Sequence, residues 1–438
     1  MNNLHEKFIE NMKEQLPKNE WEAFFACYDF PPVKGVRLNV LKGGRDALKA
    51  KLPFLGERVE WEENGFYATQ DKLGANVFHA AGLFYSQEPS AMSAAPLLNV
   101  QKGERVLDLC SAPGGKGTQL ASKMQGEGII VLNEPIFSRA KILSQNVERL
   151  GIKNAVVTSL MPEKLAEKFT GYFDKVLVDA PCSGEGMFRK NAEEALREWS
   201  EENVELCAKR QAHILHEATS VLRVGGMLVY STCTFSYAED EGQVFDYLQK
   251  HPNMRLIKQE KLYPHKVKGE GHFVALFEKI AGDQQADLKG IKRVVSRETD
   301  KQIRVFESTC LQNVHFENLH EAGGAVYALP KNCFSFDGIQ ILRAGIKLGE
   351  MKNGRFEPDH ALVMASEKGN WKNALDLSQD DERVRAFLHG ESITLLANED
   401  LGNGWCAVCV EGYPIGLGKA VNGVIKNHLP KGLRALSR

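Results

Sequence analysis

Long apolar segments are missing from this chain. No apolar run reaches the roughly 18 residues that a membrane helix needs, so we expect no transmembrane segment. The opening residues, MNNLHEKFIENMKEQLP, also lack the apolar stretch and small-residue cleavage site of a secretory signal. These absences predict a cytoplasmic protein that does not bind a membrane.

A disulfide framework and an excess of one charge are absent as well. The 9 cysteines are scattered, and several lie in apolar strand-like runs, which is typical of a reducing compartment. The 55 basic side chains nearly balance 57 acidic ones, which excludes a uniformly basic nucleic-acid-binding protein. Any contact with RNA must therefore use a local patch.

Metal-binding patterns are not evident either. Cys406 and Cys409 form a C-x-x-C pair, but no second pair with zinc-like spacing accompanies them. The histidines are dispersed, and we find no internal repeat. We expect no metal site.

The organisation predicts several domains, because 438 residues exceed what one core holds. The first part mixes a helical opening with short apolar runs broken by Pro31 and Pro32, which is typical of an α+β domain. A polar linker spans 281–290, and short strands with glycine turns follow it, as in barrel-like modules. We place the domains at 1–75, 76–282 and 283–438.

The central part alternates short β-branched runs with amphipathic segments. The expected strands are RVLDLC, GIIVLN, NAVVTS, KVLVDA and MLVYST, and the expected helices include KGTQLASKM and SRAKILSQNVERL. Repetition of strand, helix and strand predicts an α/β fold, with an open and mainly parallel sheet covered by helices on both faces.

A glycine turn joins the first of these strands to its helix. Small residues there let a ligand approach the backbone, and the helix N-terminus offers free amide groups to a carboxylate such as that of methionine. The string is neither a P-loop, since Cys110 stands at the first glycine position, nor a G-x-G-x-x-G dinucleotide turn. The candidate cofactor residues of this turn are Cys110, Ser111, Ala112, Pro113, Gly114, Gly115 and Lys116.

Acidic and thiol side chains follow the other strands. Glu134 ends the second strand, where doubly wound folds hold a ribose diol. Asp179 and Cys182 follow the fourth strand, and Cys233 follows the fifth, so both thiols are expected at one edge of the sheet. A solvated role for Glu134 and a packing role for either cysteine are the alternatives.

Two thiols at one edge suit methylation of a pyrimidine. Carbon 5 of cytosine is a weak nucleophile, and addition of a thiolate to carbon 6 makes carbon 5 carbanion-like. A second group must then assist release of the cysteine. We expect Asp179 to hydrogen-bond the exocyclic amine of the base or, when Asp179 is protonated, its ring nitrogen.

At these residues the sequence resembles the Nop/Sun family of RNA cytosine-5 methyltransferases, and its RsmF-type branch in particular. The resemblance covers nearly the whole chain and rests on LDLCSAPGGKG, DKVLVDAPCSGEGMFRK, GGMLVYSTCTF, GLFYSQEPSAM and GYPIGLGKAVNGVIKNHLPKGLR. It implies a Rossmann-like methyltransferase core with C-terminal PUA-like modules, and S-adenosylmethionine as the cofactor. The implied partner is 16S ribosomal RNA or the small ribosomal subunit. We expect the protein to be a monomer.

The resemblance also implies roles for individual residues. Cys233 matches the nucleophile of the family and Cys182 the residue that promotes release of the methylated RNA, although the residues alone leave their order open. Cys110 to Lys116, Glu134, Arg139 and Asp179 match cofactor-contacting positions, and Lys116 is also implied to reach the target nucleotide. Leu160 departs from the polar residue that the family places near adenine, so Ser159 or backbone groups are the alternatives.

RNA contacts are expected at both ends of the chain. Residues 413–438 contain no Asp or Glu and form a basic patch of Lys419, Lys426, Lys431, Arg434 and Arg438. Arg37 and Asn39 fit either an RNA-facing strand or a structural role. Transfer RNA as the substrate, and a catalytically idle assembly factor with the same fold, are the rival functions.

Overall fold

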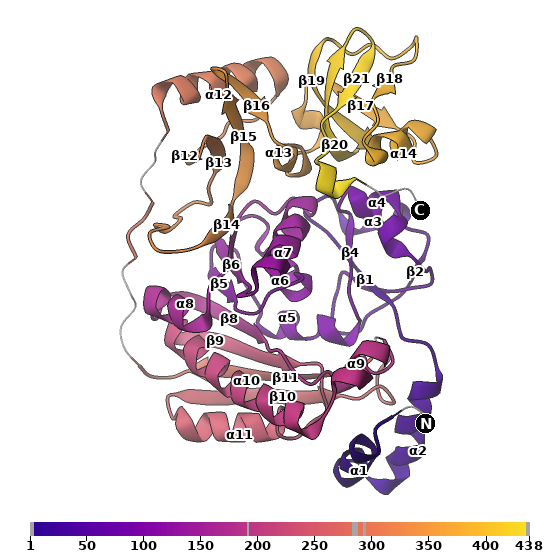
Figure 1. Cartoon of the computed structure of the whole chain (residues 1–438), viewed down its shortest axis with the longest axis vertical. Helices are drawn as coiled ribbons and strands as arrows, with labels where there is room; N and C mark the ends of the chain where they lie inside the picture. Colours follow the sequence, from indigo (N-terminus) through magenta and orange to yellow (C-terminus); the bar gives the residue numbers. More distant parts are fainter. Residues whose placement is uncertain (1–3, 191, 283–287, 292–294, 435–438) are drawn as a thin grey trace.

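The computed structural model describes residues 4–190, 192–282, 288–291 and 295–434. Residues 283–287 of the predicted linker lie outside this part of the chain. Figure 1 shows a central twisted sheet, with the N-terminal helices below it and two further sheets of the C-terminal region above it. Within the described residues, no helix combines the length and the apolar character that crossing a membrane requires.

The N-terminal region contains a helical pair and a small antiparallel sheet. Helices α1 (Glu6–Gln15) and α2 (Trp21–Ala26) bury phenylalanines such as Phe8 and Phe24 against Trp199 and Phe235 of the central region. The sheet has the order β2-β3-β1-β4. Its elements are β1 (Gly35–Leu38), α3 (Arg45–Ala50), β2 (Leu55–Arg58), β3 (Gly65–Ala68), α4 (Val77–Ala80) and β4 (Phe84–Ser86).

The central sheet confirms the predicted fold class. Its order is β10-β11-β9-β8-β5-β6-β7-β14, and the five strands from β9 to β7 are parallel. Antiparallel strands flank them on both sides. The strands are β5 (Arg105–Asp108), β6 (Ile129–Asn133), β7 (Ala155–Thr158), β8 (Phe173–Asp179), β9 (Leu222–Thr232), β10 (Met254–Leu262), β11 (His272–Lys279) and β14 (Ile341–Ala344).

Helices cover both faces of this sheet, because its strands are apolar on both sides. One face packs on α8 (Pro162–Phe169), α10 (Glu201–Val221) and α11 (Glu241–Lys250). The other face packs on α5 (Ala94–Leu97), α6 (Gly115–Met124) and α7 (Phe137–Arg149). Helix α9 (Ala192–Glu198) lies near the N-terminal helices in Figure 1.

The C-terminal region contains two small sheets, with the orders β12-β13-β15-β16 and β17-β19-β20-β21-β18. The first part consists of α12 (Arg297–Cys310), β12 (Leu319–Ala322), β13 (Ala325–Ala328), β15 (Ile346–Lys352), β16 (Arg355–Pro358) and α13 (His360–Met364). The second consists of β17 (Ala374–Leu377), α14 (Glu382–His389), β18 (Ile393–Thr394), β19 (Gly404–Val410), β20 (Tyr413–Val421) and β21 (Val424–Asn427).

The division into domains at residues 75 and 282 stays a prediction. At each boundary, a strand from one side pairs with a strand from the other. Strand β4, at residues 84–86, pairs with β1 of the N-terminal sheet. Strand β14, at residues 341–344, pairs with β7 and so extends the central sheet. Nothing in the local sequence pattern distinguishes such a long-range strand from a strand of its own module.

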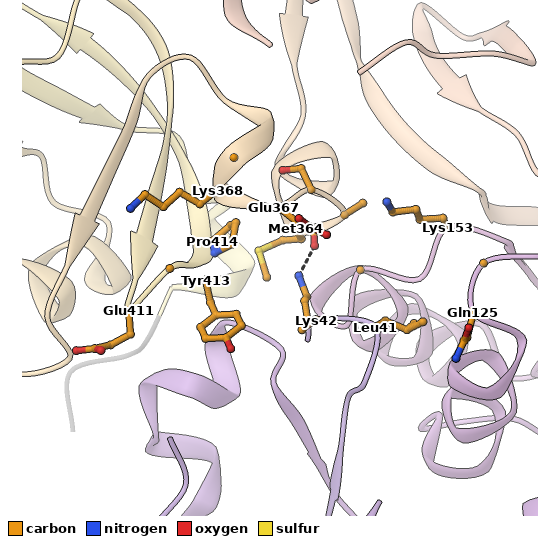
Figure 2. A pocket seen from close by; sticks show the side chains of 16 residues that line it. Leu41, Lys42, Gln125, Lys153, Met364, Glu367, Lys368, Glu411, Tyr413 and Pro414 are labelled. Carbon is orange, nitrogen blue, oxygen red and sulfur yellow. Dashed lines mark hydrogen bonds between the residues drawn. The ribbon is translucent and has the colours of Figure 1, made fainter. Parts of the chain in front are cut away.

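A cavity of about 460 Å³ lies where the N-terminal, central and C-terminal regions meet (Figure 2). Lys42 points across this junction and donates from Nζ to the carbonyl of Met364, at the end of α13. Burial lowers the pKa of Lys42 to about 7, and nearby Lys153 adds to the effect. Residues 125–126 and 151–153 precede β6 and β7, so this cavity lies at the amino edge of the sheet, opposite the predicted site.

A buried ion-pair cluster attaches β14 to the core. Glu148 of α7 forms an ion pair with Arg343 of β14 and a hydrogen bond with His360, whose Nδ1 lies 2.8 Å from Oε1 of Glu148. Burial alone would raise the pKa of Glu148, but the hydrogen bond from His360 and the charge of Arg343 lower it to about 2. The ionised carboxylate therefore stabilises the folded state.

We predict that Glu148→Gln lowers the unfolding free energy at pH 7 by about 2–4 kcal/mol, the scale of a pKa shift of this size. The folded pKa lies below the ordinary 4.5, so this stabilisation is complete above pH 4.5 and is lost as the pH falls toward 2. Urea unfolding at pH 7 and pH 3.5 measures it. The exposed Glu10→Gln is the control, and an equal loss at both pH values would contradict the prediction.

Candidate active site

The carboxyl ends of the parallel strands bring the predicted site residues together. Strand β8 ends at Asp179, which pairs in register with Ser231 of β9. Strand β5 ends at Asp108, and the glycine turn follows it. Because parallel strands present the same end at one edge, side chains far apart in the sequence lie side by side here.

The glycine turn has the backbone that a close ligand requires. The Ala112–Pro113 peptide bond is cis, and Gly114 has φ of 113°, in the left-handed region that favours glycine. Helix α6 begins at Gly115, so the amides of its first turn have no partner within the helix. The amide of Ser111 donates to the carbonyl of Asn133 at 2.8 Å, which ties the turn to β6.

Glu134 is buried beside this turn. One of its oxygens accepts the amide of Ile136 at 3.0 Å, and the other lies 3.3 Å from Nη1 of Arg139. Arg139 also donates to the carbonyl of Ala112 at 3.1 Å. The structure therefore brings together three of the predicted cofactor residues, Glu134, Arg139 and Ala112.

The two predicted active-site cysteines are in direct contact. Sγ of Cys182 lies 3.2 Å from Sγ of Cys233, and the amide of Cys233 donates to Sγ of Cys182 at 3.3 Å. The hydrogen bond with Cys233 and burial raise the pKa of the Cys182 thiol well above its usual range. Burial raises the pKa of Cys110 in the same way. Cys182 and Cys110 are therefore thiols at neutral pH.

Asp179 connects the thiol loops with the glycine turn. Its Oδ2 lies 2.8 Å from Nζ of Lys116 on α6, and its Oδ1 accepts the hydroxyl of Ser231 at 2.9 Å. Lys116 is almost fully buried, whereas the Asp179 side chain is 33% exposed. A partly exposed carboxylate is thus paired with a buried cation.

Sequence reasoning missed a buried network behind the cysteines. The carboxylate of Glu239 accepts the amide of Ser183 at 3.0 Å, the hydroxyl of Ser183 at 2.5 Å and Nε2 of Gln211 at 2.8 Å. The Ser183 hydroxyl also lies 2.8 Å from that of Thr234. The network fixes the residues directly after Cys182 and Cys233. The acids in SYAEDEG gave no sign that Glu239 points inward.

Asp108 is a second residue that sequence reasoning missed. It ends β5 inside VLDLC, and neither carboxylate oxygen has a hydrogen-bond partner among the described residues. Burial raises its pKa to about 7. A buried acid next to the glycine turn can accept hydrogen bonds from a cationic or hydroxyl-bearing ligand. Its place at the strand end was the available signal.

Of the two roles that the sequence left open for Arg37 and Asn39, the structure favours the structural one. Arg37 is buried and donates to Gln87 at 3.0 Å, to the carbonyl of Gly115 at 3.1 Å and to the hydroxyl of Thr118 at 2.7 Å. Asn39 is buried and bonds the carbonyls of Gly82 and Leu150 at 2.8 Å each. Both residues hold the N-terminal sheet on α6 and α7.

Ser159 and Leu160, which follow the third parallel strand, already have hydrogen-bond partners within the protein. The amide of Ser159 already donates to the carbonyl of Gln340 at 3.2 Å, and its hydroxyl donates to the carbonyl of Pro135. The backbone of Leu160 bonds Asn133 through both its amide and its carbonyl. Which group contacts adenine stays open.

The predicted C-terminal patch is only partly available to a ligand. Lys426 of β21 and Lys431 are exposed, and Lys419 lies over the ring of Trp405 at 5.0 Å. Arg434 packs against Gly390 and donates to the carbonyl of Leu429 at 3.2 Å, so it stabilises the module. Arg438 lies outside the described residues.

Metal-ligating clusters are not found in the part of the chain that the structure describes. Cys406 and Cys409 are buried in β19. Burial raises the pKa of each thiol to about 12, as for packing residues.

Comparison with known proteins gives matches along nearly the whole chain. Four family models match: the N-terminal domain of 16S rRNA methyltransferase RsmF over 4–89, 16S rRNA methyltransferase RsmB/F over 95–278, the RsmF rRNA methyltransferase first C-terminal domain over 305–365, and the methyltransferase RsmF PUA domain over 373–435. The Ribosomal RNA small subunit methyltransferase F of Vibrio vulnificus (strain YJ016) is 32% identical, covering 98% of this chain and 97% of the relative.

Solved structures agree with this result. A methyltransferase homolog protein from Pyrococcus horikoshii is 27% identical, with a TM-score of 0.55, over 61% of this chain and 92% of that chain. NSun6 from Pyrococcus horikoshii with SFG has a TM-score of 0.58 over 64% of this chain and 99% of that chain. At 22% identity, this second likeness shows the fold alone.

We predict that Gly117→Ala destabilises the protein through the glycine turn. A methyl group there would lie 2.4 Å from Oγ of Ser111 and 2.7 Å from Oδ2 of Asp108, closer than real contacts allow. This crowding should lower the unfolding free energy by about 1–3 kcal/mol. Urea unfolding measures the loss. Gly432→Ala, which meets nothing within 4 Å, is the control, and equal stability of the two variants would disprove the crowding.

Proposed function

This chain belongs to the RsmF branch of the Nop/Sun family of methyltransferases, and we propose that it methylates carbon 5 of a cytosine in 16S ribosomal RNA from S-adenosylmethionine. The observation that carries the proposal is the 3.2 Å contact between Cys182 and Cys233, beside the ion pair of Asp179. Two thiols and a carboxylate at one edge are the groups that this chemistry needs.

The residues around the glycine turn fit S-adenosylmethionine. The amides at the start of α6 suit its carboxylate, and the buried carboxylates of Asp108 and Glu134 suit its amino group and ribose hydroxyls. When bound, this cofactor supplies an electrophilic methyl group. We assign cofactor binding to Cys110–Lys116, Glu134, Arg139 and Asp179.

Cys233 is the nucleophile in this proposal. Its thiolate adds to carbon 6 of cytosine, a bond forms between Sγ and carbon 6, and the electron pair of the 5,6 double bond moves onto carbon 5. Asp179 hydrogen-bonds the exocyclic amine and orients the ring. After methylation a base takes the carbon 5 proton, the C–H electron pair re-forms the 5,6 double bond, and the bond between Sγ and carbon 6 breaks, so that Cys233 leaves as the thiolate.

Cys182 assists release in this proposal. Its sulfur lies 3.2 Å from Sγ of Cys233, close enough to hydrogen-bond Cys233 as it departs. The reversed order, with Cys182 as the nucleophile, is the alternative that the following experiment decides.

We predict that Cys233→Ala forms neither 5-methylcytosine nor a covalent adduct with RNA that contains 5-fluorocytosine, whose fluorine blocks elimination. Cys182→Ala should still form the adduct and should accumulate a slow-migrating complex with ordinary RNA, because release is impaired. Denaturing gels and methylation mapping on 16S and transfer RNA measure both effects. An adduct in Cys233→Ala would reverse the assignment, and methylation of transfer RNA alone would change the substrate.

RNA docking belongs to the C-terminal modules in this proposal. Lys426 and Lys431 are exposed in the region that the PUA model matches, and phosphate contacts position an RNA without reading its sequence. Ribosomal RNA as the substrate agrees with a cytoplasmic enzyme. That the chain acts as a monomer stays a prediction.

We predict that Lys426→Ala combined with Lys431→Ala weakens RNA binding and reduces the salt dependence of log K by up to about two units, roughly one per lost phosphate contact. Cofactor affinity should be unchanged, since the glycine turn lies in another region. Titrations at several salt concentrations test this. A double variant of the exposed Lys164 and Lys209 is the control, and identical slopes in both variants would remove the docking role.

A further inference from the structure

His272 is a buried polar side chain without a partner. It opens β11 and is 1% exposed, and neither ring nitrogen makes a hydrogen bond of good geometry among the described residues, although the backbone of Gly271 lies near the ring. Buried polar groups are nearly always hydrogen-bonded, and leaving one unsatisfied costs free energy. An imidazole kept at this cost calls for a functional explanation.

The sheet places His272 beside the two active-site loops. Strand β11 pairs antiparallel with β9, and Phe273 lies opposite Thr232, so His272 lies next to Cys233 across the ladder. Side chains alternate between the faces of a sheet. Val274, Val229 and Leu177 share one core cluster, so His272, Ser231 and Asp179 point to that same face, at its carboxyl edge.

The backbone before His272 is held by Glu88 and Ser90, from the string GLFYSQEPSAM. The carboxylate of Glu88 accepts the amides of Ser90, Ala91 and Glu270, each within 2.9 Å. The hydroxyl of Ser90 accepts the amide of Gly271 at 3.1 Å. These bonds hold the backbone that leads into His272.

The positive charge of Lys116 acts on the ring of His272. Burial and then the charge of Lys116 lower the pKa of His272 well below its usual range, so the imidazole is neutral. A neutral imidazole has one nitrogen that accepts a hydrogen bond. The ammonium of Lys116 has three donors, and Asp179 takes one of them.

We propose that His272 is a positioning residue for Lys116: its ring accepts a hydrogen bond from the ammonium when Asp179 turns from Lys116 to the target cytosine. The inference rests on the proposed function, because it requires a base for Asp179 to bind. Without a second acceptor, the buried ammonium would lose its partner at the moment the base enters.

The chemistry of the base explains why a neutral acceptor is suitable. Attack of the thiolate places negative charge on the cytosine ring, and a nearby cation stabilises it. A carboxylate at position 272 would neutralise Lys116, whereas an apolar side chain would leave the ammonium unsatisfied. An imidazole holds the lysine and leaves its charge in place.

The experiment compares His272→Phe, which removes the acceptor, with His272→Gln and His272→Asn, which keep one. We expect His272→Phe to slow single-turnover adduct formation with 5-fluorocytosine RNA by roughly tenfold or more, the effect of losing a hydrogen bond to a charged group. At least one amide variant should restore most of the rate. Affinity for S-adenosylmethionine should stay within about twofold, because no cofactor-binding group is removed.

Thermal unfolding separates this role from a structural one. In His272→Phe an apolar ring replaces an imidazole that lacks a good partner, so the melting temperature should be unchanged or higher. The variant should therefore lose activity without losing stability. A wild-type rate in His272→Phe, amide variants as slow as His272→Phe, or a clear fall in melting temperature would each overturn the inference. If the wild type forms neither adduct nor 5-methylcytosine, the proposed function itself fails.

Discussion

Lys116 and Asp179 form an ion pair between α6 and the end of β8, with 2.8 Å between Nζ and Oδ2. It joins the glycine turn, which we assign to the cofactor, to the loop that carries Cys182. Lys116 is nearly buried, and a buried charge without a partner is strongly destabilising. The relative position of the two halves of the site therefore depends on this contact, and so does the role we propose for His272.

The N-terminal region supports this arrangement from one side of the sheet. Arg37 binds the first turn of α6, and Glu88 and Ser90 hold the chain that leads into β11. The residues that prepare the site thus come from a region that contributes no group to the proposed chemistry. The same region shares a hydrophobic core with the last C-terminal sheet, for example through Phe84 and Phe387, and so joins that sheet to the rest of the molecule.

Prediction from sequence worked best where a local pattern determines the structure. The five parallel strands, helices α6 and α7 and the glycine turn formed as expected, because strand periodicity and small residues at a turn act within a few positions. Arg37 was ambiguous for the opposite reason: the same alternating pattern fits a strand facing RNA and a strand facing α6. Strand β14 and the inward-pointing Glu239 had no local signal at all.

The sequence by itself determined the fold class, the family and the set of reactive side chains, since these follow from local patterns and from strings that few proteins share. Only the tertiary structure decided which of these groups touch. The contact of Cys182 with Cys233 and the pairing of Lys116 with Asp179 each join residues that the chain separates by tens of positions. Strand order and the packing of helices on the sheet create such contacts, and no single stretch of sequence determines either of them.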